Sequence, residues 1–263
     1  MIYSTLNMKT LRVGFIGTGK KKARGDLAGF AMAYAHAAAY QALPGMELAA
    51  CADIVKENAE AFAQETGTRA IYTDYRAMLK KEKLHVVSIC TWPHLHAPMV
   101  IAAAQAGVKA IHCEKPMAYT WGEAVKMSQV AKRCGVKLTF NHQRRFGAPF
   151  RKLRNLAWSG KLGNLKRMEG YCPNLYDWGT HWVDMLNMFN RETPGEWVIG
   201  QLHCRSGRRW FGAPCEDQGV YHIKYRNGVQ GLIFTGGERV DTCALRLVGT
   251  KRGGRTRSEE HTS

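Results

Sequence analysis

The sequence has no apolar run of about 18 residues, the length that a membrane helix needs, and its start, MIYSTLNMKT, lacks the apolar core of a signal peptide. These absences predict a cytoplasmic protein without a membrane partner. The sequence also lacks a C-x-x-C pair, because its 8 cysteines are scattered along the chain. Scattered cysteines in a reducing compartment favour buried thiols over disulfides and over metal ligands. We therefore expect no bound metal.

Acidic residues are scarce. The chain has 21 Asp and Glu against 38 Lys and Arg, a formal net charge of +17. Such an excess can indicate a nucleic-acid partner, but here the basic residues are not gathered on one helix face beside aromatic side chains. They are spread over residues 20–24, 80–83, 144–154, 205–209 and 251–257. We expect no nucleic-acid partner and assign part of the charge to an anionic cofactor or substrate.

Apolar residues are also absent from residues 251–263, KRGGRTRSEEHTS, which we interpret as a disordered or non-native tail. The first seven residues are interpreted as a loose extension. The remaining length is sufficient for two domains of modest size. We assign a dinucleotide-binding domain to residues 8–142 and a second domain to residues 143–250.

The first half alternates short apolar segments with helical patterns. Three of the helical patterns are followed by a glycine, at Gly67, Gly107 and Gly135, as expected for helix C-termini. This alternation predicts a doubly wound parallel sheet of the α/β class. Its strands are expected at 11–16, 46–52, 70–72, 86–90, 108–113 and 137–141.

The second half has a different pattern. A helix is predicted at 150–158, followed by a turn at Gly160–Gly163 and then by alternating strands. Asn227-Gly228 separates two such strands, 220–225 and 229–234, and is a strong hairpin signal. The second domain is therefore predicted to be α+β with a mainly antiparallel sheet.

The segment GFIGTG ends the first strand and predicts a phosphate-binding turn. Gly17 permits the sharp turn, and Gly19 allows main-chain N–H groups beside Thr18 to approach a pyrophosphate. The third glycine of the usual spacing is missing, since Lys22 occupies that position, and we interpret Lys20 to Arg24 as an inserted basic loop. Asp53 ends the second strand, where a carboxylate can accept hydrogen bonds from ribose hydroxyls. It favours NAD over NADP.

Polar segments follow two further strands at the same predicted sheet edge. The first is TWPHLH, with Thr91, Pro93 and His96, and the second is Glu114-Lys115-Pro116. Pro116 restricts the backbone of Lys115, so its ammonium is presented in a fixed direction. Taken alone, each segment is also consistent with an ordinary polar loop.

The segment YDWGTHWVDMLNMF predicts a helix with two faces. Asp177, His181 and Asp184 are spaced i, i+4 and i+7, so they share one stripe of a regular helix. Histidine suits proton transfer near neutral pH, and a neighbouring carboxylate stabilises its charged form. A second stripe is apolar and is expected to be buried: Trp182, Met185, Leu186 and Phe189.

Together with NHQRRF at 141–146, these motifs resemble the Gfo/Idh/MocA family of nicotinamide-dependent oxidoreductases, which includes inositol and sugar dehydrogenases. The resemblance runs from about Met8 to about Thr250. It implies that Lys115, Asp177 and His181 surround the reacting carbinol. It implies cofactor contacts for Gly17, Thr18, Gly19, Asp53, Thr91, Pro93, His96, Glu114 and Lys115, and substrate contacts for Arg144, Arg145 and Asp184.

The resemblance implies an NAD-dependent dehydrogenase that acts on a sugar, inositol or related polyol. Two alternatives remain open on the same scaffold: a glycosidase or aldose–aldose oxidoreductase that retains NAD, and a non-catalytic NAD-binding sensor. Members of the family are longer than this chain, so we expect a second domain that lacks its last strands and closing helix. Such a domain leaves a sheet edge exposed. The full-length form is expected to be a homo-oligomer, a dimer or tetramer.

Overall fold

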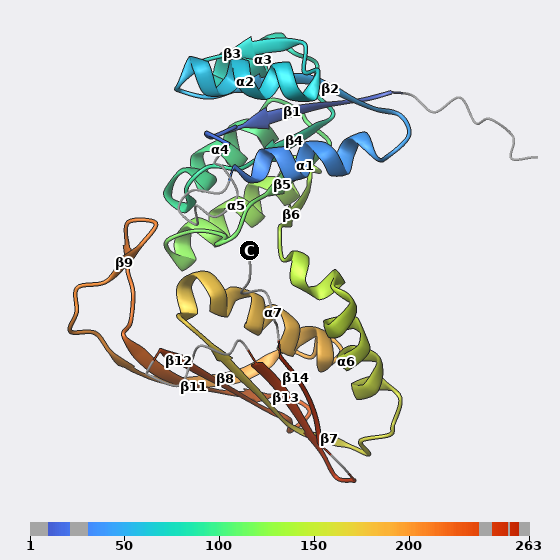
Figure 1. Cartoon of the computed structure of the whole chain (residues 1–263), viewed down its shortest axis with the longest axis vertical. Helices are drawn as coiled ribbons and strands as arrows, with labels where there is room; N and C mark the ends of the chain where they lie inside the picture. The colour runs from blue at the N-terminus through green and yellow to red at the C-terminus, as the bar shows by residue number, and fades with distance from the viewer. Residues whose placement is uncertain (1–9, 22–30, 237–243, 252, 258–263) are drawn as a thin grey trace, which may run out of the picture. The chain divides into compact units, whose positions relative to one another are not determined.

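The computed structural model describes residues 10–21, 31–236, 244–251 and 253–257, and the chain divides into two compact units, residues 1–141 and 142–263 (Figure 1). No helix within these described ranges is long and apolar enough to cross a membrane. The cysteines within them form no disulfide: Cys51, Cys113, Cys172 and Cys215 are buried thiols, whereas Cys134 and Cys204 are exposed.

The first unit is built on a six-stranded sheet in the order β3-β2-β1-β4-β5-β6, with every neighbouring pair parallel. This confirms the predicted doubly wound sheet, and the strand bounds differ from the predicted ones by two residues at most. β2 and β3 lie on one side of β1, whereas β4, β5 and β6 lie on the other, so the strand order reverses between β1 and β4. Folds of this kind bind ligands at this point. The strands are β1 (Leu11–Ile16), β2 (Met46–Ala52), β3 (Ala70–Tyr72), β4 (Val86–Ile89), β5 (Ala110–Cys113) and β6 (Lys137–Phe140).

Helices cover both faces of this sheet, and each face has its own apolar core. Phe15 of β1 packs with Phe62 on the face covered by α1 and α2, whereas its neighbour Ile16 belongs to the core under α3, α4 and α5. Alternate side chains of a strand point to opposite faces, so a continuous apolar run serves both cores. The helices are α1 (Met32–Gln41), α2 (Lys56–Thr66), α3 (Tyr75–Lys81), α4 (Pro93–Gln105) and α5 (Trp121–Arg133).

Local sequence accounts for several helix ends. α5 begins at a capping box, in which the Thr120 hydroxyl accepts from the main-chain N–H of Glu123 and the Glu123 carboxylate accepts from that of Thr120. α2 ends at Gly67, whose φ of 72° is a left-handed conformation that glycine adopts without strain. These signals are local, so they set these two helix ends without tertiary information.

The second unit contains a six-stranded sheet in the order β14-β13-β7-β12-β11-β8. β7 and β12 are parallel and the other pairs are antiparallel, as expected for a mainly antiparallel sheet. The hairpin between β11 and β12 turns at Asn227-Gly228, as predicted. The elements are α6 (Ala148–Trp158), β7 (Leu165–Cys172), α7 (Thr180–Phe189), β8 (Gly195–His203), β9 (Arg209–Trp210), β10 (Ala213–Pro214), β11 (Gln218–Tyr225), β12 (Gln230–Gly236), β13 (Ala244–Gly249) and β14 (Gly253–Arg257).

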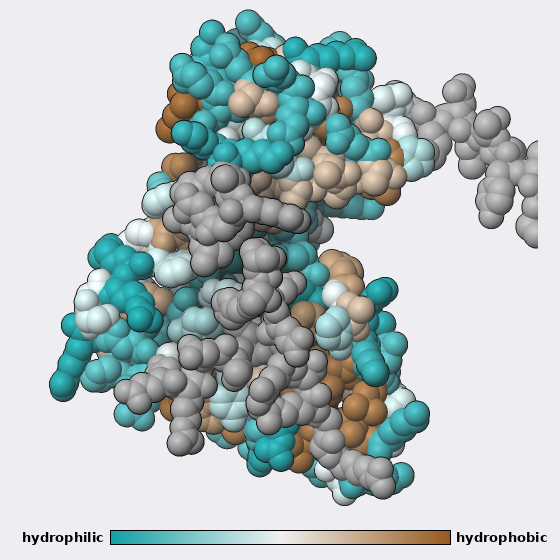
Figure 2. Space-filling model, in the orientation of Figure 1, coloured by the Kyte–Doolittle hydropathy of each residue, from teal (hydrophilic) through white to brown (hydrophobic). Residues whose placement is uncertain are grey.

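One face of this sheet packs against α6 and α7, whose apolar side chains form the core of the unit. The predicted apolar stripe of α7 lies in this core, because Trp182, Met185, Leu186 and Phe189 are all buried. The edge strand β8 is exposed along its whole length, with Val198 and Ile199 65% and 66% exposed. Figure 2 shows that hydrophobic and hydrophilic side chains share the surface.

Residues 253–257, which we expected to be part of a disordered tail, form β14 and pair with β13 along its length. The pairing uses main-chain groups, which every non-proline residue carries, so it requires no apolar side chain. The lack of apolar residues therefore did not exclude a strand at the sheet edge. Residues 252 and 258–263 of the predicted tail lie outside the described part of the chain.

Candidate functional site

The tip of β1 carries the glycine turn. Gly17 has a φ of 80°, and a Cβ on it would lie 2.5 Å from Cγ2 of Thr91, so only glycine fits between the tips of β1 and β4. Gly19 also has a positive φ, 65°. The conformation at Gly17 and Gly19 is the one expected of a phosphate-binding turn. Lys22 and Arg24 of the predicted basic loop lie outside the described residues, and Lys21 is paired with Glu65.

Asp53 contacts this turn directly, which the sequence did not predict. Its Oδ2 accepts hydrogen bonds from the main-chain N–H groups of Thr18 (2.9 Å) and Gly19 (2.8 Å), and its Oδ1 accepts from that of Val55 (2.9 Å). The carboxylate therefore fixes the turn as well as standing at the tip of β2. Each carboxylate oxygen has two acceptor positions, and because Oδ2 also accepts from the Thr18 hydroxyl (3.1 Å), the position left for a further donor is on Oδ1.

His96 lies inside the first unit rather than on its surface. The side chain is 0% exposed, with Nε2 3.0 Å from the carbonyl oxygen of Thr91 and Nδ1 3.0 Å from that of Pro116. Burial lowers the pKa of His96, against the opposing effect of these carbonyl contacts. The ring thus joins the segment after β4 to the segment after β5. Pro93 opens α4 in its first turn, where a missing N–H is tolerated.

Glu114, at the end of β5, belongs to a buried polar cluster. Its Oε1 accepts from Nε2 of His36 (2.9 Å) and from Nδ2 of Asn141 (2.7 Å), while its Oε2 accepts from the main-chain N–H of Lys115 (3.1 Å). Burial disfavours the charged carboxylate, but the hydrogen bonds from His36 and Asn141 outweigh burial, and the pKa of Glu114 lies below its ordinary value. The cluster fixes the backbone at Lys115.

His36 was missed by the sequence reasoning. It lies in α1, within the alanine-rich segment MAYAHAAAYQ, and no spacing relates it to the strand-end motifs. Its ring spans the cluster, because Nδ1 is 2.6 Å from the hydroxyl oxygen of Ser88 in β4. A single histidine among small apolar residues was the only available signal.

In the second unit, Asp177 lies in a π-helical turn, Leu175–Gly179, that precedes α7. The N–H of Gly179 donates to the carbonyl oxygen of Asn174, five residues earlier (2.8 Å), and the Asn174 side chain accepts from the N–H of Asp177 (2.7 Å). The buried carboxylate of Glu216 accepts from the N–H of Leu175 (2.6 Å) and from the Thr235 hydroxyl (2.8 Å). Asn174 and Glu216 thus satisfy the first N–H groups of the helix.

The π turn changes the predicted stripe of Asp177, His181 and Asp184, because a regular helical repeat no longer relates Asp177 to the other two. Asp177 and His181 are buried, 4% and 3% exposed, whereas Asp184 is partly exposed. The His181 ring lies edge-on to the ring of His142, with centroids 5.5 Å apart. The single stripe predicted for a regular helix was therefore wrong for Asp177, whereas His181 and Asp184 both lie in α7.

The two arginines of the NHQRRF segment have different surroundings. Arg145 forms ion pairs with Asp184 (2.9 Å) and Glu192 (2.8 Å). The guanidinium of Arg144 lies over the Trp178 ring, 4.7 Å from its centroid, and 5.6 Å from that of Trp182. Burial raises the pKa of Asp184, against the effect of Arg145. The structure therefore pairs Arg145 with Asp184, two residues that we had expected to contact substrate.

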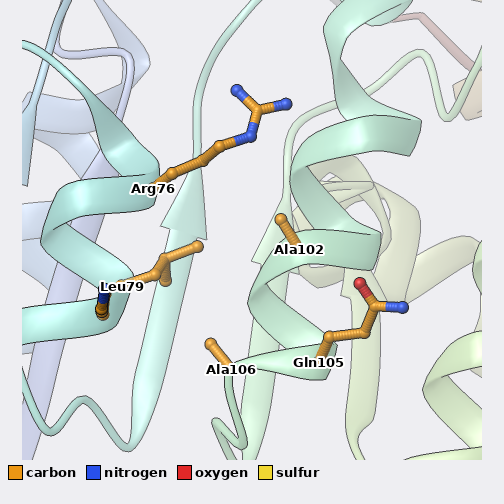
Figure 3. A pocket seen from close by; sticks show the side chains of 6 residues that line it. Arg76, Leu79, Ala102, Gln105 and Ala106 are labelled. Atoms are coloured by element: carbon orange, nitrogen blue, oxygen red, sulfur yellow. The ribbon is translucent and has the colours of Figure 1, made fainter.

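The predicted catalytic residues are divided between the units, with Lys115 in the first and Asp177 and His181 in the second. A cavity in the first unit lies elsewhere, between α3 and the C-terminal end of α4 (Figure 3). The C-terminal end of α4 lies at the amino edge of the parallel sheet, so this cavity is not at the strand tips. It is lined by Arg76, Leu79, Lys80, Ala102, Gln105 and Ala106. Within the described ranges, no cluster of three or more His, Cys, Asp or Glu is placed to hold a metal ion.

The chain belongs to the Gfo/Idh/MocA family, since the model of this oxidoreductase family with an NAD-binding Rossmann fold matches residues 11–142. D-glucoside 3-dehydrogenase of Escherichia coli is 30% identical over 162 residues, which are 62% of this chain and 43% of the relative. Levoglucosan dehydrogenase of Pseudarthrobacter phenanthrenivorans is 32% identical over 210 residues, 74% of this chain and 49% of the relative. The chain thus spans less than half the length of these curated relatives.

The fold is shared with solved structures. The crystal structure of the WlbA dehydrogenase from Bordetella pertussis, in complex with NADH and UDP-GlcNAcA, matches with a TM-score of 0.79 and 22% sequence identity. The match covers 95% of this chain and 79% of that chain. It confirms a Rossmann unit followed by a unit with a mixed, mostly antiparallel sheet.

Proposed function

We propose that this chain forms part of an NAD-dependent oxidoreductase that transfers a hydride between a sugar, inositol or related polyol and nicotinamide. One observation carries the proposal: the positive-φ turn at Gly17 and Gly19 and the Asp53 carboxylate lie on the adjacent tips of β1 and β2 in a Rossmann sheet of this family. Residues 8–142 are the proposed dinucleotide-binding domain and residues 143–250 the proposed substrate domain.

The residues at these tips fit a dinucleotide. The turn at Gly17, Thr18 and Gly19, whose N–H groups are bonded to Ala52 and Asp53, would lie against the pyrophosphate. The remaining acceptor position on Oδ1 of Asp53 would accept from a ribose hydroxyl. A carboxylate at this place repels a 2′-phosphate, which favours NAD over NADP. Thr91 and Pro93 would line the nicotinamide side, and Glu114 would contact the cofactor ribose. His96, being buried, would contribute by holding Thr91 in place.

The nicotinamide ring, when bound, would accept the hydride from the substrate carbinol. His181 would take the hydroxyl proton, since imidazole exchanges protons near neutral pH, and Asp177 would stabilise the resulting imidazolium. Lys115 would donate a hydrogen bond to the substrate oxygen. Arg144, Arg145 and Asp184 would orient the other polar groups of the substrate.

The substrate class is supported by relatives named as dehydrogenases of D-glucoside and of levoglucosan. The decisive experiment incubates the 263-residue chain with a panel of sugars, sugar acids and polyols and with NAD or NADP, and follows NADH or NADPH absorbance. We expect steady NADH formation with at least one of them. NAD binding without any turnover would favour a sensor, and substrate conversion without NADH release would favour an enzyme that retains its cofactor.

A homo-oligomer is also proposed, and exposed apolar side chains of β8 support it, since an edge strand with Val198 and Ile199 exposed favours association. Light scattering after size exclusion should give a mass above that of one chain. A Val198→Lys, Ile199→Lys variant should shift this mass toward that of one chain, whereas an unchanged mass would reject β8 as the interface.

A further inference from the structure

The polar cluster beneath Lys115 joins four elements of the first unit. His36 comes from α1, Ser88 from β4, Glu114 from the end of β5 and Asn141 from the end of β6. His36 and Glu114 are 6% and 7% exposed, and Ser88 is fully buried. Burial of such groups is unfavourable unless each finds a partner, and here the hydrogen bonds provide those partners.

The direction of the hydrogen bonds follows from chemistry. An ionised carboxylate only accepts, so Nε2 of His36 carries the proton that it donates to Glu114. The other oxygen of Glu114 accepts the main-chain N–H of Lys115. His36 is therefore connected to the backbone of Lys115 through a single carboxylate, although 78 residues separate His36 from Glu114.

We propose that His36 is a positioning residue for hydride transfer: by binding Glu114 it holds the Lys115 backbone in the conformation that aims the Lys115 ammonium. The proposal rests on the role proposed above for Lys115. His36 does not act on the substrate itself. It acts through Glu114, so its loss should lower kcat more than it weakens NAD binding.

Among the described residues, the titratable groups that face His36 are in the first unit. Besides Glu114, they are Cys90, whose Sγ is 3.4 Å from Nδ1, and His112, whose ring centroid is 4.9 Å from that of His36. The pKa of His112 is lowered by burial and, to a smaller extent, by His36, and burial raises the pKa of the Cys90 thiol. Glu114 is thus the acceptor available to His36 for a charge-assisted hydrogen bond.

Two substitutions at His36 separate positioning from packing. In His36→Gln the amide nitrogen can take the place of Nε2 and still donate to Glu114, whereas in His36→Asn the shorter side chain reaches Ser88 but not Glu114. His85→Gln is the matched control, because the His85 ring also holds a main-chain N–H, that of Arg12 (3.0 Å), but at the amino edge of the same sheet. Each variant is measured for kcat, KM, NADH affinity and melting temperature.

We expect His36→Gln and His85→Gln to retain most of the wild-type kcat, and His36→Asn to lose roughly 10- to 100-fold, as expected for one hydrogen bond to a charged group. NADH affinity should change less than kcat. Equal kcat values for His36→Asn and His36→Gln would overturn the proposal, as would a loss confined to melting temperature.

A second measurement does not depend on turnover. The carboxyl ¹³C signal of Glu114, assigned with Glu114→Gln, is titrated in the wild type and in the two His36 variants. His36→Asn should raise the pKa of Glu114 and His36→Gln should not. If no substrate is oxidised, the proposed function fails while this titration still decides whether His36 controls Glu114. An unchanged pKa in His36→Asn would overturn the inference even in an active enzyme.

Discussion

The two units hold their proposed catalytic groups in different ways. In the first, Lys115 follows a strand, and its backbone is held by Glu114 and by partners from α1 and β6. In the second, Asp177 and His181 lie at the start of a helix whose first N–H groups are bound by Asn174 and Glu216. A strand tip is fixed by groups from several elements, whereas a helix start is fixed chiefly by its caps. Removing one of these hydrogen-bond partners should therefore have different effects on kcat and on stability in the two units.

The largest effect on kcat should come from a substitution in the second unit, where the proposed catalytic groups lie at the start of a helix. His181→Ala removes the proposed proton acceptor and should lower kcat by about 10²- to 10⁴-fold, the usual contribution of general acid–base catalysis. NADH affinity, measured by fluorescence titration, should remain because the proposed cofactor turn lies in the first unit. The control is His203→Ala, because His203 is an exposed histidine of the second unit, like His181 in residue type but outside the proposed site. Unchanged turnover in His181→Ala would remove the proposed role.

In the first unit, where Lys115 follows a strand, the test is Lys115→Met. This substitution keeps the aliphatic part of the side chain and removes its charge. We expect kcat to fall by about 10²-fold, since a charge-assisted hydrogen bond that forms in the transition state contributes on the order of 2 to 3 kcal/mol. Lys109→Met serves as the control at the opposite edge of the sheet. A change in KM alone would assign Lys115 to binding rather than to the chemical step.

A smaller effect is expected when the support of the helix is weakened. Glu216→Ala leaves the N–H of Leu175 and the Thr235 hydroxyl without their acceptor, which should lower the free energy of unfolding by about 1 to 3 kcal/mol. Urea unfolding measures this loss, and Glu196→Ala on exposed β8 should show little change. If Glu216→Ala matched the wild type in both stability and kcat, Glu216 would have no part in holding the helix start.

The smallest effect is a difference in pH dependence. The pKa of Glu114 lies below its ordinary 4.5, so its contribution to stability is present above pH 4.5 and is lost as the pH falls through the lower pKa of the folded state. Asp184 has a raised pKa, mainly through burial, so its contribution is present below its ordinary 3.8 and is lost as the pH rises. The free energy of unfolding of Glu114→Gln and of Asp184→Asn is measured at several pH values. The differences of the two variants from the wild type should change with pH in opposite directions. Slopes of the same sign would refute this difference.

Much of the first unit was predictable because its information is local. Apolar runs gave the strands, Gly67 marks a helix end, and Gly17 marks a turn that no other residue fits. In the second unit the Asn227-Gly228 turn was equally local. The prediction for Asp177 and His181 was less accurate because it assumed a regular helical repeat, and the π turn replaces that repeat with one set by Asn174 and Glu216.

The sequence by itself determined the order of strands and helices in the first unit, the class of each sheet and the placement of Gly17, Asp53 and Lys115 at strand ends, because these follow from hydrophobic period and from turn chemistry. Only the tertiary structure decided what holds those residues. The bonds of Asp53 to the glycine turn, of His36 to Glu114 and of Glu216 to Leu175 join residues 34, 78 and 41 positions apart. Such pairs meet only when strands and helices pack, and no local pattern encodes which polar group will find which partner.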